Sequence, residues 1–180
     1  MIYVIEGPDR CGKSTFINHL RNNILNPRQL IIHSSKPPKE LFGDLLQRWT
    51  MIYYNELINN AIKLNNEGFD IILDRSWISE TVYGPLYRKL SLPLNVLEHA
   101  IGENSHMFKL CIFQDDPIKL LSREDGESDA QNINDKTKEL AAFTSAYSQT
   151  VIKKQFKFNW ADLPFRKDVL EEYAKTVIKS

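Results

Sequence analysis

Residues Gly7-Pro8-Asp9-Arg10-Cys11-Gly12-Lys13-Ser14 match the pattern G-x-x-x-x-G-K-[ST], and this stretch decides the fold. It directly follows an apolar run at residues 2–5 and opens an amphipathic stretch at residues 14–25, which predicts a strand, a loop and a helix in that order. In such a loop the backbone N–H groups surround a phosphate, and the start of the helix adds positive potential. The sequence therefore predicts a loop that binds a nucleoside triphosphate.

Strands and helices are predicted to alternate along the rest of the chain. Short apolar runs predict four more buried strands, at residues 30–33, 71–73, 109–113 and 156–158. Helical spacing of apolar residues predicts helices at 41–66, 117–122, 138–153 and 165–179. Such alternation implies right-handed crossovers and a parallel sheet covered on both faces. We expect an α/β fold with a five-stranded parallel sheet, in one domain that spans residues 1–180.

The composition excludes several classes of protein. The 180 residues contain 23 Lys plus Arg and 23 Asp plus Glu, so the net charge gives no reason to expect a nucleic-acid polymer or a membrane surface as partner. Cys11 and Cys111 are far apart and form no CxxC motif, which argues against a disulfide scaffold. No apolar run approaches the roughly 20 residues that a membrane span needs. These features predict a cytoplasmic protein.

A second motif, Asp74-Arg75-Ser76, follows the strand predicted at residues 71–73. The carboxyl ends of strands are where open α/β sheets bind ligands. Asp74 is a candidate to orient Mg²⁺ through water, and Arg75 is a candidate to bind a second phosphate with two hydrogen bonds. The alternatives are that Asp74 caps the next helix and that Arg75 forms a surface ion pair. The chain lacks the N-K-x-D motif of regulatory GTPases, and outside the P-loop it lacks their D-x-x-G switch motif.

Three segments resemble the thymidylate kinase family of nucleoside monophosphate kinases. Residues 6–15 are similar to that family's E-G-x-D-R-x-G-K-[ST]-T, residues 74–84 to D-R-[YH]-x-x-S-x-x-A-[YF], and residues 116–123 to D-P-x-x-A-L-x-R. The resemblance implies a three-layer P-loop kinase fold. It also implies transfer of the γ-phosphoryl group of ATP to a deoxynucleoside monophosphate, most directly dTMP to dTDP.

The resemblance assigns roles in phosphoryl transfer. Asp9 would approach the sugar hydroxyl of the acceptor, and Arg10 would stabilise the transferred group. This agrees with the chemistry, because phosphoryl transfer depends mainly on positioning and on cations around the phosphates. We therefore expect Arg10, Lys13 and Arg75 to be catalytic, and Ser14 and Asp74 to hold Mg²⁺. The expected ATP site consists of Gly7, Asp9, Arg10, Cys11, Gly12, Lys13, Ser14, Thr15 and Arg123.

The expected acceptor site departs from the family pattern. The family usually has Arg-Glu-Pro after the second strand, whereas Lys36 is the first cation here, either as a phosphate ligand or as an ordinary loop lysine. Trp49 fits the aromatic that stacks on the base, but Tyr53 stands where the family has an arginine. Tyr83 resembles the acceptor-site aromatic, and for both Trp49 and Tyr83 the alternative is a role in the core. Asp9, Asp74 and Arg75 complete the expected substrate site. The residues that would recognise the acceptor base therefore differ from those of the family. The base is thymine, another pyrimidine or a modified pyrimidine.

Residues 123–136 are predicted to form the lid. This segment is rich in acids, and Arg123 is the only arginine between Arg88 and Arg166. We expect a lid that mainly shields the site, with an open solvated loop as the alternative. The family holds adenine at a turn that would fall at residues 159–163. The apolar stretch 41–66 offers a face for a homodimer, as in the family, or for the core.

Two other functions remain to be separated from the first. Deoxynucleoside kinases phosphorylate a 5′-hydroxyl and need a base, typically a glutamate just after the second strand. Here Lys36 comes before the first carboxylate, Glu40, which favours a phosphorylated acceptor, although His33 is a candidate base. The last alternative is a module that binds ATP without turnover.

Overall fold

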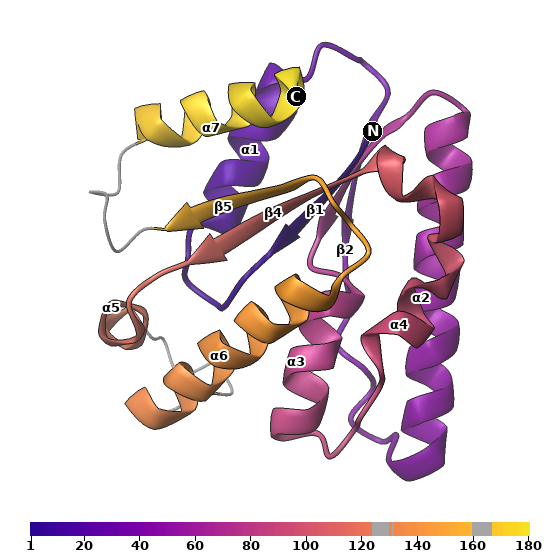
Figure 1. The fold of residues 1–180 in the computed structure, drawn as a ribbon, viewed down its shortest axis with the longest axis vertical. Coiled ribbons are helices and arrows are strands. Elements are labelled where there is room, and N and C mark those ends of the chain that lie inside the picture. The colour runs from indigo at the N-terminus through magenta and orange to yellow at the C-terminus, as the bar shows by residue number, and fades with distance from the viewer. Residues whose placement is uncertain (124–129, 131, 160–166) are drawn as a thin grey trace.

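A parallel sheet with strand order β2-β3-β1-β4-β5 forms the centre of the computed structural model (Figure 1). The structure describes residues 1–123, 130, 132–159 and 167–180. Within this part of the chain the sheet has five strands, which are β1 (Ile2–Glu6), β2 (Gln29–His33), β3 (Asp70–Asp74), β4 (Phe108–Gln114) and β5 (Gln155–Asn159). In the register of the central pair, Ile5 lies beside Asp74, so the end of β3 is level with the start of the P-loop.

Helices cover both faces of the sheet (Figure 1). On one face, α1 (Lys13–Asn23) packs against α7 (Lys167–Lys179) over a cluster that includes Phe16, Phe113 and Phe158. The opposite face is covered by α2 (Gly43–Asn66), α3 (Trp77–Tyr87), α4 (Leu94–Leu97) and α6 (Ile133–Gln149). Strand β4 is preceded by the 3-10 turns Glu98–Ala100 and Gly102–Met107. It is followed by the short helix α5 (Pro117–Ser122). The predicted α/β fold is confirmed.

All five predicted strands are present, each one or two residues longer than its apolar run. The helices differ more from the prediction. Helix α6 begins at Ile133 rather than at residue 138, because the Asn132 side chain accepts a hydrogen bond from Asp135 N at 3.0 Å and caps it. It ends at Gln149 because Thr150 is extended. No range was predicted for helix α3, which the sequence suggested only as the helix that Asp74 was a candidate to cap; it contains Pro85 and continues to Tyr87.

The predicted lid is only partly described. Residues 133–136 belong to α6, and the expected lid boundary stays a prediction. Its acids at 124, 125, 127 and 129 lie outside the described residues, as does the predicted adenine-binding turn from residue 160 onward. On α2, Leu45 and Ile52 are exposed, so the expected dimer face stays a prediction. The helices described here include none long and apolar enough to cross a membrane.

Candidate active site

The P-loop joins β1 to α1 and has an unusual backbone. Gly7, Arg10 and Gly12 have φ angles of 140°, 66° and 85°. A Cβ atom on Gly7 would lie 2.4 Å from the carbonyl oxygen of Phe113, so only glycine fits there. Gly12 occupies the N-cap position of α1, and the first N–H groups of this helix therefore face the loop. The arrangement is suited to an anion.

A cavity opens between the P-loop and the end of β3, and we call it the P-loop cavity. Every residue that lines it was predicted as a site residue from the sequence. They are Asp9, Arg10, Gly12, Lys13, Ser14, Thr15, Asp74 and Arg75. Two segments far apart in the sequence thus meet as expected.

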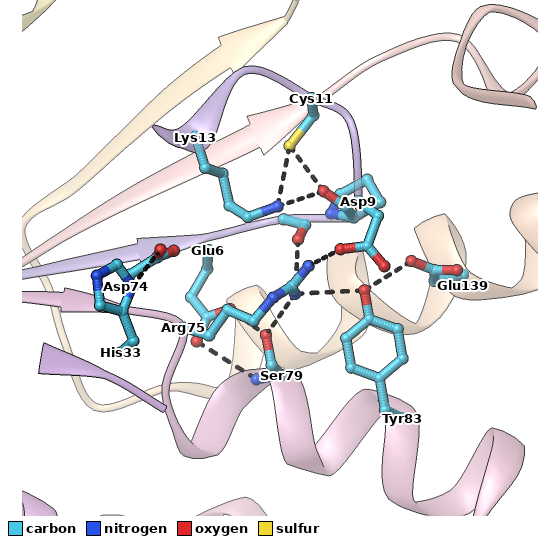
Figure 2. A network of polar contacts seen from close by, with 12 residues as sticks. Glu6, Asp9, Cys11, Lys13, His33, Asp74, Arg75, Ser79, Tyr83 and Glu139 are labelled. Atoms are coloured by element: carbon cyan, nitrogen blue, oxygen red, sulfur yellow. Dashed lines mark hydrogen bonds and ion pairs between the residues drawn. The ribbon is translucent and has the colours of Figure 1, made fainter. Parts of the chain in front are cut away.

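Lys13 is held inside the loop. Its Nζ donates to Pro8 O at 2.5 Å and lies 3.6 Å from the Cys11 sulfur, as Figure 2 shows. Cys11 Sγ also donates to Pro8 O, at 2.9 Å. Burial lowers the pKa of Lys13, and the nearby Arg75 charge lowers it further. Cys11 is therefore a structural partner of Lys13, and neither Cys11 nor Gly7 lines the cavity.

Arg75 connects the P-loop to α3 (Figure 2). Its Nη1 donates to Gly7 O and Ser79 Oγ, both at 3.2 Å, and to the Tyr83 hydroxyl at 3.3 Å. Its Nη2 pairs with Asp9, and the guanidinium lies 5.3 Å from the Tyr83 ring centre. Burial would raise the pKa of Asp9, but the positive charges of Arg75 and of three nearby lysines together outweigh burial and hold this pKa below its usual value. The alternative of an isolated surface ion pair for Arg75 is wrong.

Glu6 positions the segment that carries Arg75. This fully buried carboxylate accepts hydrogen bonds from Ser76 Oγ at 2.6 Å and Ser79 Oγ at 2.5 Å. Burial raises the pKa of Glu6, and the two serine bonds oppose that shift. Glu6 was not among the predicted site residues, although an acid at the end of an apolar strand is the signal that would have found it.

A second cavity, which we call the α3 cavity, adjoins the first and shares Asp9 and Arg75 with it. Lys36 and Tyr83 line it, as the sequence predicted. Six further lining residues were not predicted, and they are Ser34, Ser35, Tyr54, Ser79, Glu80 and Arg88. Its volume is about 50 Å³, which is smaller than a typical small-molecule site of roughly 300 Å³ or more.

Trp49 and Tyr53 line neither the P-loop cavity nor the α3 cavity. Their rings stack with centres 4.8 Å apart, and the Tyr53 hydroxyl accepts a hydrogen bond from Ser35 N at 3.0 Å. They therefore support the loop that carries Lys36. The predicted stacking of Trp49 on a base stays a prediction, and the aromatic side chain of α2 that lines the α3 cavity is Tyr54.

Asp74 and Ser14 fit a Mg²⁺ ion. Both line the P-loop cavity, and hydroxyl and carboxylate oxygens are ligands that Mg²⁺ prefers. Asp74 Oδ2 is 2.8 Å from His33 Nδ1, which orients the carboxylate. Asp74 does not cap α3, since the Ser76 side chain accepts from Ile78 N and fills that role.

Arg123 lies outside both cavities. Its Nη1 donates to Asp115 Oδ2 at 2.7 Å and to Arg10 O at 3.2 Å. It therefore anchors the P-loop backbone from the end of α5. Its predicted contact with ATP stays a prediction.

Helix α6 supplies an ionic cluster that sequence reasoning missed. The Tyr83 hydroxyl donates to Glu139 Oε1 at 2.8 Å, and Lys136 Nζ lies 3.9 Å from Glu139 Oε2. Both α6 side chains are fully buried. The chain of contacts runs from α6 through Tyr83 and Arg75 to the P-loop (Figure 2). Lys136 was missed because the predicted helix began after it.

Replacing Tyr83 with phenylalanine should lower the free energy of unfolding by about 1–3 kcal/mol, because Glu139 loses its hydroxyl donor in a buried setting. Tyr87→Phe is the matched control. The Tyr87 hydroxyl lies 3.5 Å from Glu139 Oε2, at the limit of a hydrogen bond, so its loss should cost less than about 0.5 kcal/mol. Urea unfolding of both variants measures the difference. If both variants lost the same free energy of unfolding, the Tyr83–Glu139 hydrogen bond would not be a major stabilising contact.

A P-loop that opens a helix, faced by an arginine across two joined cavities, defines the chain as a protein with the fold of P-loop kinases. The YorR protein of Bacillus subtilis, solved in complex with phosphorylated GDP, superimposes with a TM-score of 0.67 at 22% identity, over 99% of this chain and 94% of that one. Thymidylate kinase from Candida albicans also gives a TM-score of 0.67, at 14% identity over 99% and 90% of the two chains.

One curated relative is also named as a thymidylate kinase. It is a protein of Acidianus bottle-shaped virus (isolate Italy/Pozzuoli), provisionally named a thymidylate kinase, and is 34% identical over 88 residues. The match covers 49% of this chain and about half the length of the relative. No protein-family model matches the chain. The comparisons confirm the resemblance to thymidylate kinases and the fold.

Proposed function

We propose that this chain is a nucleotide kinase that moves the γ-phosphoryl group of ATP to a deoxynucleoside monophosphate, with dTMP as the first candidate acceptor. The observation that carries the proposal is the position of Arg75, which lines both the P-loop cavity and the α3 cavity. One cation thus faces the places where a donor and an acceptor phosphate would meet. The partial match to a thymidylate kinase supports the same class of activity.

The side chains suit an in-line transfer. Lys13 and the N–H groups of the P-loop would bind the triphosphate of ATP, and Lys36 would bind the acceptor phosphate. An oxygen of that phosphate attacks the γ-phosphorus, the bond to the bridging oxygen breaks, and ADP leaves. Arg10 and Arg75 would stabilise the charge that spreads over the transferred group. Mg²⁺ bound near Ser14 and Asp74 would neutralise charge on the donor phosphates.

The monophosphate is favoured because its oxygen is already ionised at neutral pH and needs cations rather than a base. Lys36 and Arg75 line the α3 cavity, and the pKa of Asp9 is lowered against burial by Arg75 together with nearby lysines. Asp9 is thus a poor proton acceptor. These features support a phosphorylated acceptor.

A deoxynucleoside kinase is the second candidate, favoured by one contact. His33 Nδ1 lies 2.8 Å from Asp74 Oδ2, an arrangement that orients an imidazole as a general base. His33 does not line the α3 cavity, however. The contact therefore supports this candidate less strongly than Arg75 supports the first.

An ADP-release assay separates these functions. The protein is incubated with ATP, Mg²⁺ and either deoxynucleosides or deoxynucleoside monophosphates, with EDTA in a parallel sample. We expect turnover with at least one monophosphate and loss of turnover with EDTA. Turnover with nucleosides alone would replace the first proposal with the second. Tight ATP binding without turnover on any acceptor would indicate a binding module.

A further inference from the structure

The carboxylate of Asp9 lies on the cation that we propose for the acceptor phosphate. It pairs with Arg75 Nη2, and both residues line the P-loop cavity as well as the α3 cavity (Figure 2). Burial would raise the pKa of this carboxyl, but positive charges lower it, and they belong to Arg75, Lys13, Lys136 and Lys36. The resemblance to thymidylate kinases implies instead that Asp9 approaches a sugar hydroxyl. In this structure Asp9 therefore takes a position that suits an anionic ligand.

The partners of Arg75 are of two kinds. Its Nη1 donates to Gly7 O, Ser79 Oγ and the Tyr83 hydroxyl, at 3.2, 3.2 and 3.3 Å. Ser79 and Tyr83 are buried on α3, and Gly7 belongs to the backbone of the P-loop. The side chain of Asp9, in contrast, is 40% exposed. Asp9 is thus a partner that a ligand entering from solvent can replace.

The ion pair has a physical reason. The side chain of Arg75 is only 22% exposed, and a largely buried guanidinium without an anion beside it costs free energy. Asp9 neutralises Arg75 whenever no acceptor phosphate is bound. A phosphate monoester carries up to two negative charges and three acceptor oxygens, so it can replace a carboxylate on the same donors.

The size of the α3 cavity agrees with such a replacement. At about 50 Å³ the cavity is smaller than a nucleotide needs, so side chains that line it must move when an acceptor binds. Asp9 lines both cavities, and moving its side chain would enlarge the space beside Arg75.

We propose that Asp9 competes with the acceptor phosphate for Arg75, so that an acceptor binds only after the Asp9 carboxylate has left the guanidinium. The proposal rests on the proposed function, because it takes the α3 cavity as the acceptor site. It goes further by making Asp9 a residue that sets the affinity for the acceptor. The apparent affinity is reduced by the fraction of molecules in which the pair is open, and this factor is the same for every base.

Calorimetric titration of the whole chain tests the proposal without depending on turnover. The ligands are dTMP, dGMP, dCMP and dAMP, and saturating ADP with Mg²⁺ keeps them out of the P-loop. Asp9→Asn keeps the shape of the side chain but removes its charge. We expect each monophosphate that binds to bind about 3- to 10-fold more tightly to this variant, by a similar factor for each base.

Glu40→Gln is the matched control for the change in net charge. Glu40 is exposed and lies between β2 and α2, after Lys36 in the chain, and it lines neither cavity. Its replacement should change the affinity for the same ligands by less than about twofold.

A double-mutant cycle shows whether Asp9 acts through Arg75. In Arg75→Gln there is no guanidinium to compete for, so adding Asp9→Asn should bring no further gain in affinity. If Asp9 merely lowered the electrostatic potential around the site, the gain would persist in the Arg75→Gln background. Urea unfolding checks that each variant is folded.

Several results would overturn the inference. They are a gain that persists in Arg75→Gln, an unchanged or weaker affinity in Asp9→Asn, and the absence of monophosphate binding to Asp9→Asn. If Arg75→Gln does not fold, a crystal structure of the wild type with the bound monophosphate decides. An intact Asp9–Arg75 pair beside the ligand would contradict the competition, and a phosphate on Arg75 with Asp9 released would support it.

Failure of the kinase proposal looks different. It would appear as absent transfer to monophosphates, while the gain in binding affinity of Asp9→Asn and its dependence on Arg75 remained.

Discussion

Replacing Arg75 with alanine is expected to lower kcat/KM for the monophosphate acceptor by about 10³-fold or more. A single donor to a developing charge is worth about 10² to 10³ in rate, and Arg75 lines both the P-loop cavity and the α3 cavity. The variant also leaves Asp9, Ser79 and Tyr83 without their shared donor. Steady-state kinetics with the acceptor identified by the ADP-release assay measures the loss.

Arg75→Lys distinguishes charge from geometry. Lysine keeps the positive charge but cannot reach Asp9 and Tyr83 together through a planar fork. We expect it to recover less than about a tenth of the wild-type kcat/KM, with a larger effect on kcat than on the KM for ATP. A full recovery by lysine, or an alanine variant with near wild-type kinetics, would contradict the central place given to Arg75.

The strands and the P-loop could be predicted because their signals are local. A strand buried on both faces shows as a continuous apolar run, so β1 and β3 are visible without knowledge of the fold. The P-loop is a contiguous motif between two such elements. The parallel register then brings Asp74 and Arg75 to the P-loop, since Ile5 is paired with Asp74. That is why every residue lining the P-loop cavity was predicted.

The α3 cavity was harder to predict, because its residues come from the P-loop, the loop after β2, helix α2 and the segment around α3. Which helix side chains line it depends on helix rotation. Successive residues on a helix differ by about 100° in direction, so one position separates Tyr53, which supports a loop, from Tyr54, which lines the cavity. Glu139 contacts Tyr83 across 56 positions of sequence. No local pattern marks a pair so far apart.

Arg10 gives the second large expected effect. It lines the P-loop cavity with φ of 66°, and its carbonyl is fixed by Arg123 at 3.2 Å. Because the loop backbone holds this side chain at the cavity where we propose that the donor phosphates bind, Arg10→Ala should lower kcat by about 10²-fold or more, with a smaller change in the KM for either substrate. Single-turnover kinetics at saturating ATP measures the chemical step directly.

Arg10→Gly separates the side chain from the backbone. Both variants lack the guanidinium, but glycine also relieves the left-handed conformation and should be more stable than alanine by about 1 kcal/mol in urea unfolding. If the guanidinium stabilises the transferred group, the two variants lose kcat equally despite this difference in stability. A rate that follows stability, or an alanine variant with unchanged kcat, would show that Arg10 shapes the loop and takes no part in transfer. Catalysis would then depend on Lys13 and Arg75, the other cations that line the P-loop cavity.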